Sequence, residues 1–231
     1  SDVLRLKLAT GIYSQNIIST ISDRDVVNLF YGFLTSPDDI PLDENGNEYK
    51  HKIQKAKHII IGGEYDINLK MDIQVEAYIK DFTQLTNINR EMISNFDNEF
   101  IIERGLAKGI DFLLKYKNKQ LYLWTVYSLG IIQRYDEGNV YFPHFDRRHN
   151  VNFVSSLTFG NNNSWKADAR WNLGSGFPFT QTQGYYENIP FTGGINTDYI
   201  TQNGELDVIY AELNQGRLPY YHRLDLSLSK T

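Results

Sequence analysis

The residues best suited to chemistry lie in the stretch HFDRRH, in which two histidines enclose a carboxylate and two arginines. His144, Asp146 and His149 are all potential metal ligands. A metal site needs three or more convergent ligands, however, and the remaining histidines are scattered along the chain. We therefore expect no metal. The stretch instead predicts that Asp146, Arg147 and Arg148 form an ion-pair corner where a loop enters a strand.

Ser175 is a second candidate, because it lies between two glycines in GSGFP. A nucleophile elbow requires the pattern G-x-S-x-G together with Asp and His partners, and neither is present here. The chain also has no cysteine, which excludes disulfides and thiolate ligands. We expect no catalytic residue, no enzymatic activity and no cofactor.

The stretch SWKADARWNLGSG, residues 164–176, alternates between apolar and polar residues. Successive side chains of a strand point to opposite faces, so this stretch predicts a strand with one apolar and one charged face. Residues 223–229, the last alternating segment of the chain, also predict a strand with one apolar and one polar face. The charges expected to share the polar face and to pair with one another are Lys166, Asp168, Arg170, Arg223 and Asp225.

Seven other segments alternate in the same way, at residues 4–9, 58–65, 70–77, 103–115, 121–130, 151–159 and 223–229. Their alternating patterns run for roughly ten residues, whereas ordinary globular strands average about 5–6. A tilted strand that spans a membrane needs about 9–11 residues. The length of the segments therefore favours membrane-spanning strands.

The connections between these segments alternate strictly between short and long. Residues 66–69, 117–120 and 160–164 are short polar turns, and the long connections are residues 14–57, 83–99, 135–149 and 175–221. Up-and-down barrels of the outer membrane have short periplasmic turns and long extracellular loops. We predict an all-β fold, an antiparallel up-and-down transmembrane β-barrel segment of about eight long strands. Residues 206–213 are expected to add a strand outside the membrane.

Several function classes are excluded by composition. The net charge is −5 and no basic block is present, which argues against nucleic acid as a partner. No apolar run approaches the length of a transmembrane helix, and the first residues lack the apolar core of a signal peptide. A soluble sheet also alternates, but charges in the middle of its strands would be costly in a dry core.

Five stretches resemble the barrel of TonB-dependent outer-membrane receptors of the type common in Bacteroidetes. They are GIYSQN (11–16), GGEYDINLKMDIQVEAYIKDF (62–82), ERGLAKGIDFLLKY (103–116), VYFPHFDRRHNVNFVSSLTFGNNNSWKADARWNLGSGFPFTQTQGYYE (140–187) and GRLPYYHRLDLSLSK (216–230). The combination of DRRH with a following tryptophan and SGFPFT is the most specific part. The resemblance implies a barrel of about 22 strands closed by a plug domain. It further implies uptake of a scarce nutrient such as a siderophore, cobalamin or a glycan, driven by the TonB–ExbB–ExbD complex through the plug.

The chain departs from this family in having no plug, no TonB-contacting segment and too few strands. Residues 1–231 are therefore expected to be an internal part of the barrel, without the plug domain and the final strands. Residues 3–12 and 222–230 should then not pair with each other. The expected partners are outer-membrane lipid, the remaining parts of the same receptor, TonB–ExbB–ExbD and a surface lipoprotein.

Two alternatives stay open at this point. Eight strands suffice for a self-contained outer-membrane barrel with a structural, adhesion or lipid-enzyme role. A soluble β binding module is the other. In the receptor interpretation, the aromatic residues of the last long connection are candidate ligand contacts, although they could equally pack the loop on itself. These candidates are Phe177, Phe179, Tyr185, Tyr186 and Tyr199.

Overall fold

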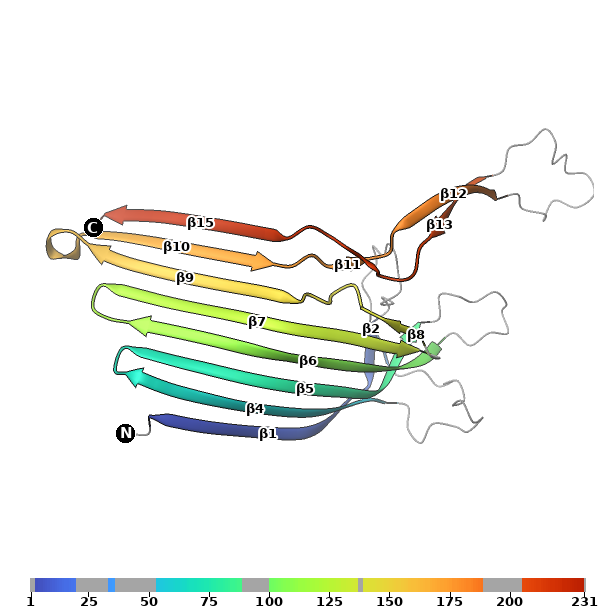
Figure 1. The fold of residues 1–231 in the computed structure, drawn as a ribbon, viewed down its shortest axis with the longest axis horizontal. Helices are drawn as coiled ribbons and strands as arrows, with labels where there is room; N and C mark the ends of the chain where they lie inside the picture. The colour runs from blue at the N-terminus through green and yellow to red at the C-terminus, as the bar shows by residue number, and fades with distance from the viewer. Residues whose placement is uncertain are drawn as a thin grey trace, which may run out of the picture.

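A computed structural model describes residues 3–19, 33–35, 53–88, 100–136, 139–188 and 205–230, and these residues form an all-β structure (Figure 1). Most of them belong to one antiparallel sheet, in which the long strands lie side by side in chain order. These strands are β1 (Leu4–Gln15), β4 (Gln54–Asn68), β5 (Met71–Ile88), β6 (Phe100–Lys117), β7 (Leu121–Asp136), β9 (His149–Phe159), β10 (Trp165–Gly174) and β15 (Tyr221–Lys230). The predicted antiparallel, up-and-down arrangement is confirmed.

The remaining strands are short and lie at the long-loop end. β8 (Asn139–Tyr141) pairs with the end of β7, and β2 (Ile17–Ser19) pairs with β3 (Phe33–Thr35). β11 (Pro178–Phe179) pairs with β14 (Gly216–Arg217). β12 (Thr182–Asn188) pairs with β13 (Glu205–Tyr210) in an arm that extends away from the sheet (Figure 1). The strand expected within residues 206–213 is thus present as β13.

The short turns are closed by asparagine side chains. The side-chain oxygen of Asn118 accepts hydrogen bonds from the backbone N–H groups of Gln120 (2.8 Å) and Leu121 (2.7 Å). Asn68 accepts one from Lys70 (2.8 Å) in the turn between β4 and β5. In the third turn, which contains the 3₁₀ helix η1 (Asn161–Asn163), Asn162 has φ 56°, a left-handed conformation that asparagine tolerates. The sequence of each turn therefore favours a tight hairpin.

One long connection starts later than the alternation predicts. The loop expected from residue 83 begins only after Ile88, because β5 continues past an irregularity in its pairing with β6. The register shifts between Phe82 and Leu85, and this β-bulge interrupts the alternation of faces. Beyond the bulge, Leu85 is buried together with polar neighbours. The polar residues beyond Phe82 suggest a loop when only the sequence is considered, although they continue strand β5 to Ile88.

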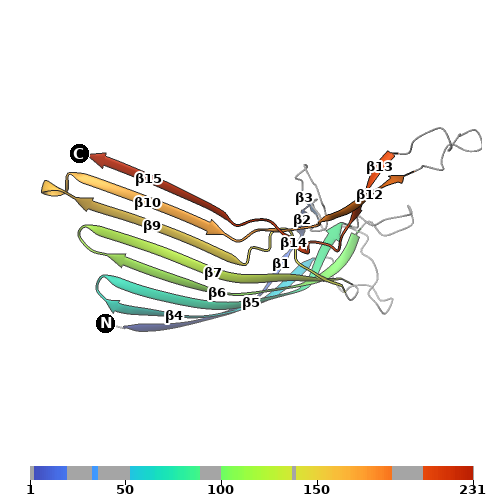
Figure 2. The same cartoon turned by 45° about the horizontal axis from the view of Figure 1, so that its top comes forward.

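The sheet is open in the described part of the chain. β1 pairs with β4 alone and β15 with β10 alone, so the first and last strands form opposite edges (Figures 1 and 2). This agrees with the expectation that residues 3–12 and 222–230 do not pair with each other. Each edge strand carries backbone N–H and C=O groups that the next strand of a sheet would bond.

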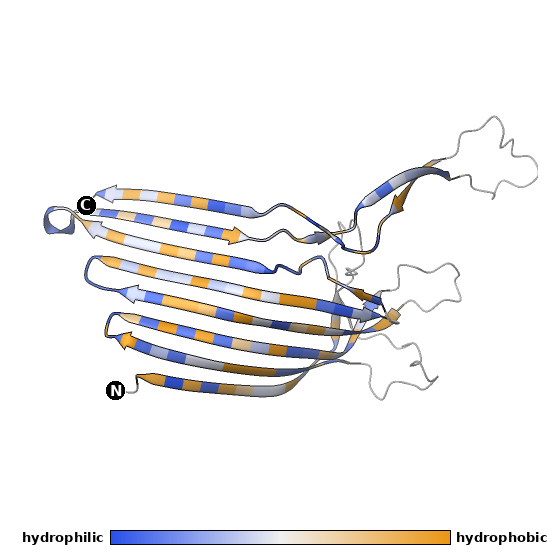
Figure 3. Cartoon of the chain, in the orientation of Figure 1, coloured by the Kyte–Doolittle hydropathy of each residue, from blue (hydrophilic) through white to orange (hydrophobic). Residues whose placement is uncertain are grey.

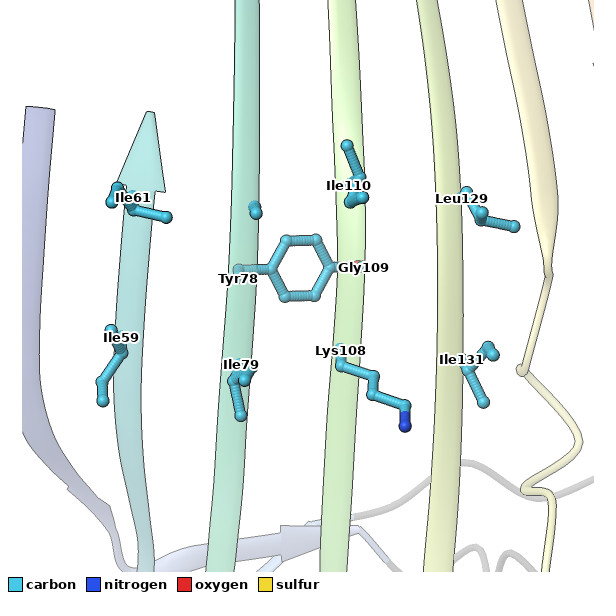
Figure 4. A pocket seen from close by; sticks show the side chains of 10 residues that line it. Ile59, Ile61, Tyr78, Ile79, Lys108, Gly109, Ile110, Leu129 and Ile131 are labelled. Carbon is cyan, nitrogen blue, oxygen red and sulfur yellow. The ribbon is translucent and has the colours of Figure 1, made fainter. Parts of the chain in front are cut away.

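A tyrosine lies across a glycine on the polar face of the sheet. Tyr78 on β5 is opposite Gly109 on β6, which is opposite Gly130 on β7. A Cβ atom on Gly109 would lie 2.5 Å from the Tyr78 hydroxyl oxygen and 2.6 Å from the Leu129 carbonyl oxygen. Only a residue without a side chain leaves this space for the ring, which Figure 4 shows extending from β5 to β6.

Gly109→Ala is expected to destabilise the folded protein by about 1–3 kcal/mol, because the added methyl group forces the tyrosine and the backbone apart. Urea titration of the complete folded protein measures the loss. Gly63→Ala is the matched control, since a Cβ there would meet only Leu6 Cδ2 at 3.7 Å. Equal losses in the two variants would contradict the role given to Tyr78.

Candidate functional site

Apolar and polar residues alternate along the long strands (Figure 3), and the register of the strands places the apolar ones on one face of the sheet. One row of directly paired residues runs through Leu8, Ile61, Ala77, Ile110 and Leu129. This face is exposed: Leu8 is 73% accessible, and Leu226 at the far side of the sheet is 72% accessible. No described segment covers it. An apolar surface of this extent requires an apolar environment or a partner.

Few apolar side chains are buried inside the sheet. Within the described residues, the buried hydrophobic side chains are Ala56, Leu85, Ala107 and Tyr141. A soluble sheet of this size would bury one apolar face against a second layer. The described residues supply no second layer, so the uncovered apolar surface is the main candidate for a functional contact.

The height of the apolar face matches a bilayer. On β5 the positions that belong to the apolar face carry apolar residues from Met71 to Ile79, and the next position on this face is Asp81. On β7 they run from Leu121 to Ile131, with only Thr125 interrupting, and the next is Gln133. Nine to eleven residues at about 3.3 Å each and a tilt of about 40° give roughly 23–28 Å. The apolar band of outer-membrane barrels is about 25 Å tall.

Aromatic side chains end the apolar face at the short-turn end. Tyr65 precedes the first short turn, Tyr116 the second, and Phe159 and Trp165 enclose the third. The rings of Phe159 and Trp165 are stacked, with centroids 6.3 Å apart. Lys230 lies with Nζ 5.3 Å from the Trp165 ring. Tyrosine and tryptophan are enriched at the interfaces of a bilayer, where one end of the ring meets water.

Ion pairs occupy the opposite face. Arg5 contacts Glu64 at 2.7 Å and Asp66 at 2.9 Å, and Lys7 contacts Glu64 at 3.0 Å. These side chains belong to β1 and β4, so the pairs join neighbouring strands. Lys115 and Asp72 pair across β6 and β5 at 3.8 Å. This face is therefore suited to water or to a polar partner.

The five charges predicted for the polar face all lie on it, and four of them pair with one another, although within a strand and not across neighbouring strands. Lys166 contacts Asp168 at 3.2 Å within β10, and Arg223 contacts Asp225 at 2.9 Å within β15. Arg170 is directly opposite Asp225 in the register, yet it forms no ion pair with a described residue. The observed ion pairs thus run along each strand, and the polar-face contact between the two strands is the hydrogen bond that Ser227 donates to Asp168 (3.4 Å).

The predicted corner is centred on Asp146, which is completely buried. Its carboxylate accepts a hydrogen bond from the Ile132 N–H (2.8 Å) and lies 3.6 Å from Arg148 Nε. Its third partner is Arg217, which also donates to the Asp146 carbonyl oxygen (2.8 Å). Asp146 therefore connects the loop before β9 with the strands β7 and β14.

Arg147 does not join this ion-pair cluster, so that part of the prediction is wrong. Its guanidinium lies 4.3 Å from the centroid of the Phe177 ring. A Cβ on Gly174 would come within 2.5 Å of the same guanidinium, so the glycine leaves room for it. The Arg147 guanidinium therefore lies between Phe177 and Gly174, and it contacts the face of the Phe177 ring instead of a carboxylate.

Arg217 is the partner that the sequence analysis missed. It is 71 positions from Asp146, and a period-two pattern carries no information about such a distant contact. One signal was available, because Arg217 is the only lysine or arginine between Arg170 and Arg223. A lone cation in such a long stretch is a candidate for a specific pairing.

A second buried carboxylate lies at the long-loop end of β6. Glu103 is 1% exposed and accepts hydrogen bonds from the Tyr141 hydroxyl (2.9 and 3.0 Å) and from the Asn87 side chain (3.3 Å). Arg134 Nη1 lies 3.8 Å away. These contacts join β5, β6, β7 and β8, so they stiffen the sheet beyond the apolar band.

The four aromatic ligand candidates that the structure describes lie in two places. Phe177 packs under Arg147, and Phe179 packs against Gly216 of β14. Tyr185 and Tyr186 lie on the arm, 63% and 45% exposed. The Tyr186 hydroxyl donates to Asp207 (3.0 Å), and this hydrogen bond with the adjacent negative charge raises the pKa of Tyr186. Tyr199 lies outside the described residues.

The described residues offer neither a metal site nor a membrane-spanning helix. They contain no group of three His, Asp or Glu side chains that could hold a metal ion. They also contain no helix with the length and hydropathy needed to cross a bilayer. Comparison of the chain with models of protein families, with curated proteins and with solved structures found no match.

Proposed function

We propose that this chain forms part of the wall of a β-barrel in the bacterial outer membrane, and that the barrel belongs to a TonB-dependent receptor. The observation that carries the proposal is the uncovered apolar face, which runs across every long strand and lies opposite a face of ion pairs. Lipid on one side and a polar interior on the other satisfy both faces at once.

The open edges support a barrel larger than these strands alone. In a bilayer, each unpaired backbone N–H or C=O group costs several kcal/mol, so the edges of β1 and β15 require further strands. A self-contained eight-stranded barrel, the alternative, requires β1 to pair with β15. Their position at opposite edges of the sheet favours the larger barrel.

The transport role rests on the resemblance of the sequence to TonB-dependent receptors. In such a receptor the polar face borders the interior and meets the plug domain, on which the TonB–ExbB–ExbD complex acts. The arm of β12 and β13 then lies on the extracellular side, where Tyr185 and Tyr186 are available to a siderophore, cobalamin or glycan, or to a surface lipoprotein.

The sidedness of the sheet can be tested with single cysteines, because the chain has none of its own. Gln183→Cys on the arm should react with a membrane-impermeant maleimide on intact cells. Lys119→Cys in a short turn should react only after the outer membrane is permeabilised, since short turns face the periplasm. The reverse labelling would invert the topology, and labelling of neither position on any membrane fraction would argue against insertion.

Uptake separates the receptor from the self-contained barrel. A strain that lacks the gene should lose growth on one of three limiting nutrients: an iron siderophore, cobalamin or a glycan. The wild-type gene should restore that growth, but not in a strain that lacks TonB. Loss of surface adhesion with all uptake intact would favour the alternative.

A further inference from the structure

The apolar face has a depression of about 360 Å³ over β4, β5, β6 and β7 (Figure 4). Ala77 is at its centre because its methyl group lies between two larger side chains, Ile61 and Ile110, in the same row of the sheet. Ile79 and Ile131 flank it toward the long loops. We call this depression the Ala77 groove. Its walls are hydrocarbon, so its natural occupant is an apolar chain.

A cationic rim closes the Ala77 groove on the side of the long loops. Lys108 lines the groove itself, and Lys57 and Arg104 lie on the same face, nearer to the long loops. None of the three forms an ion pair within the part of the chain that the structure describes. One carboxylate, Asp81, lies near these three cations, directly opposite Lys57, so the rim keeps an excess of positive charge.

A second hollow continues from the rim. It has a volume of about 300 Å³ and is lined by Asp81, Arg104, Leu106 and Tyr135. It begins where the apolar positions of β5 and β7 end, at Asp81 and Gln133. An apolar groove therefore leads to a polar hollow with unpaired cations, at the height where headgroups meet hydrocarbon.

We propose that the Ala77 groove binds an acyl chain of one membrane lipid, and that Lys108 and Arg104 hold the anionic phosphate of that lipid. This inference rests on the proposed function, because it requires the apolar face to lie in a bilayer. A lysine near the edge of the hydrocarbon extends its ammonium toward the headgroups, and each such cation favours an anionic lipid. A zwitterionic lipid offers the same chain without the net negative charge.

Native mass spectrometry of the complete barrel, with the strands that adjoin β1 and β15, released from nanodiscs tests the proposal. The nanodiscs contain equal amounts of phosphatidylcholine and phosphatidylglycerol with identical acyl chains. The wild-type protein should retain phosphatidylglycerol in preference, and Lys108→Gln should lower the retained ratio of the two lipids about fivefold. Ala77→Leu fills the groove and should reduce the retention of both lipids.

Lys117→Gln is the matched control, because Lys117 is on the same strand but on the polar face, opposite Tyr122. It should leave the lipid ratio unchanged. An unchanged ratio in Lys108→Gln overturns the proposal, as does displacement of the lipid by inorganic phosphate alone, which would indicate a free-anion site. Protease protection of each variant is measured in parallel. A complete barrel that does not insert overturns the proposed function as well, whereas insertion without lipid preference overturns the inference alone.

Discussion

Leu226→Arg is expected to destabilise the protein in a bilayer by about 2–4 kcal/mol, the cost of an arginine on the lipid face of a barrel near the midplane. Leu226 is the middle apolar residue of β15, between Leu224 and Leu228, and it is opposite Ala169. Its side chain is 72% exposed on the apolar face. Urea titration of the complete barrel folded in phosphatidylcholine vesicles, followed by tryptophan fluorescence, measures the change in the free energy of unfolding.

The neighbouring residue provides the control for this substitution. Ser227 is on the same strand but on the polar face, opposite Asp168. Ser227→Arg should change the free energy of unfolding by no more than about 0.5 kcal/mol, as exposed substitutions usually do. Arg170→Leu should also cost less than Leu226→Arg. The opposite ranking would show that the apolar face does not meet lipid.

Asp146→Ala is expected to cost about 3 kcal/mol, because it breaks a buried ion pair and removes a backbone acceptor. The carboxylate is fully buried, and Arg217, Arg148 and the Ile132 N–H all point to it. Without it, the Ile132 N–H loses its acceptor and the cationic partner Arg217 loses its counter-charge. The same titration measures this loss.

An exposed ion pair serves as the comparison. Asp225→Ala removes a carboxylate that pairs with Arg223 on the polar face, and exposed pairs contribute about 0–1 kcal/mol. A double-mutant cycle with Arg217→Ala then isolates the coupling between Arg217 and Asp146. Equal losses for Asp146→Ala and Asp225→Ala, or a coupling near zero, would contradict the central role of the corner.

The sequence alone predicted the long strands of the sheet, their two faces and their order. Period-two alternation is a local property, because successive side chains of a strand point to opposite faces whatever the rest of the chain does. The turns around Asn68, Asn118 and Asn162 are also local, because their side chains or left-handed backbone close each hairpin within a few residues. Short hairpins then align neighbouring strands, so apolar residues meet apolar residues across the whole sheet.

Only the tertiary structure shows the contacts between residues that lie far apart in the chain. The extension of β5 to Ile88 follows from a bulge against β6, which interrupts the alternation on which the prediction rested. The pairing of Asp146 with Arg217 and the position of Arg147 on Phe177 depend on how long connections return to the sheet. A local pattern states which face a side chain occupies, but the register between strands and the path of the loops determine which partner it meets.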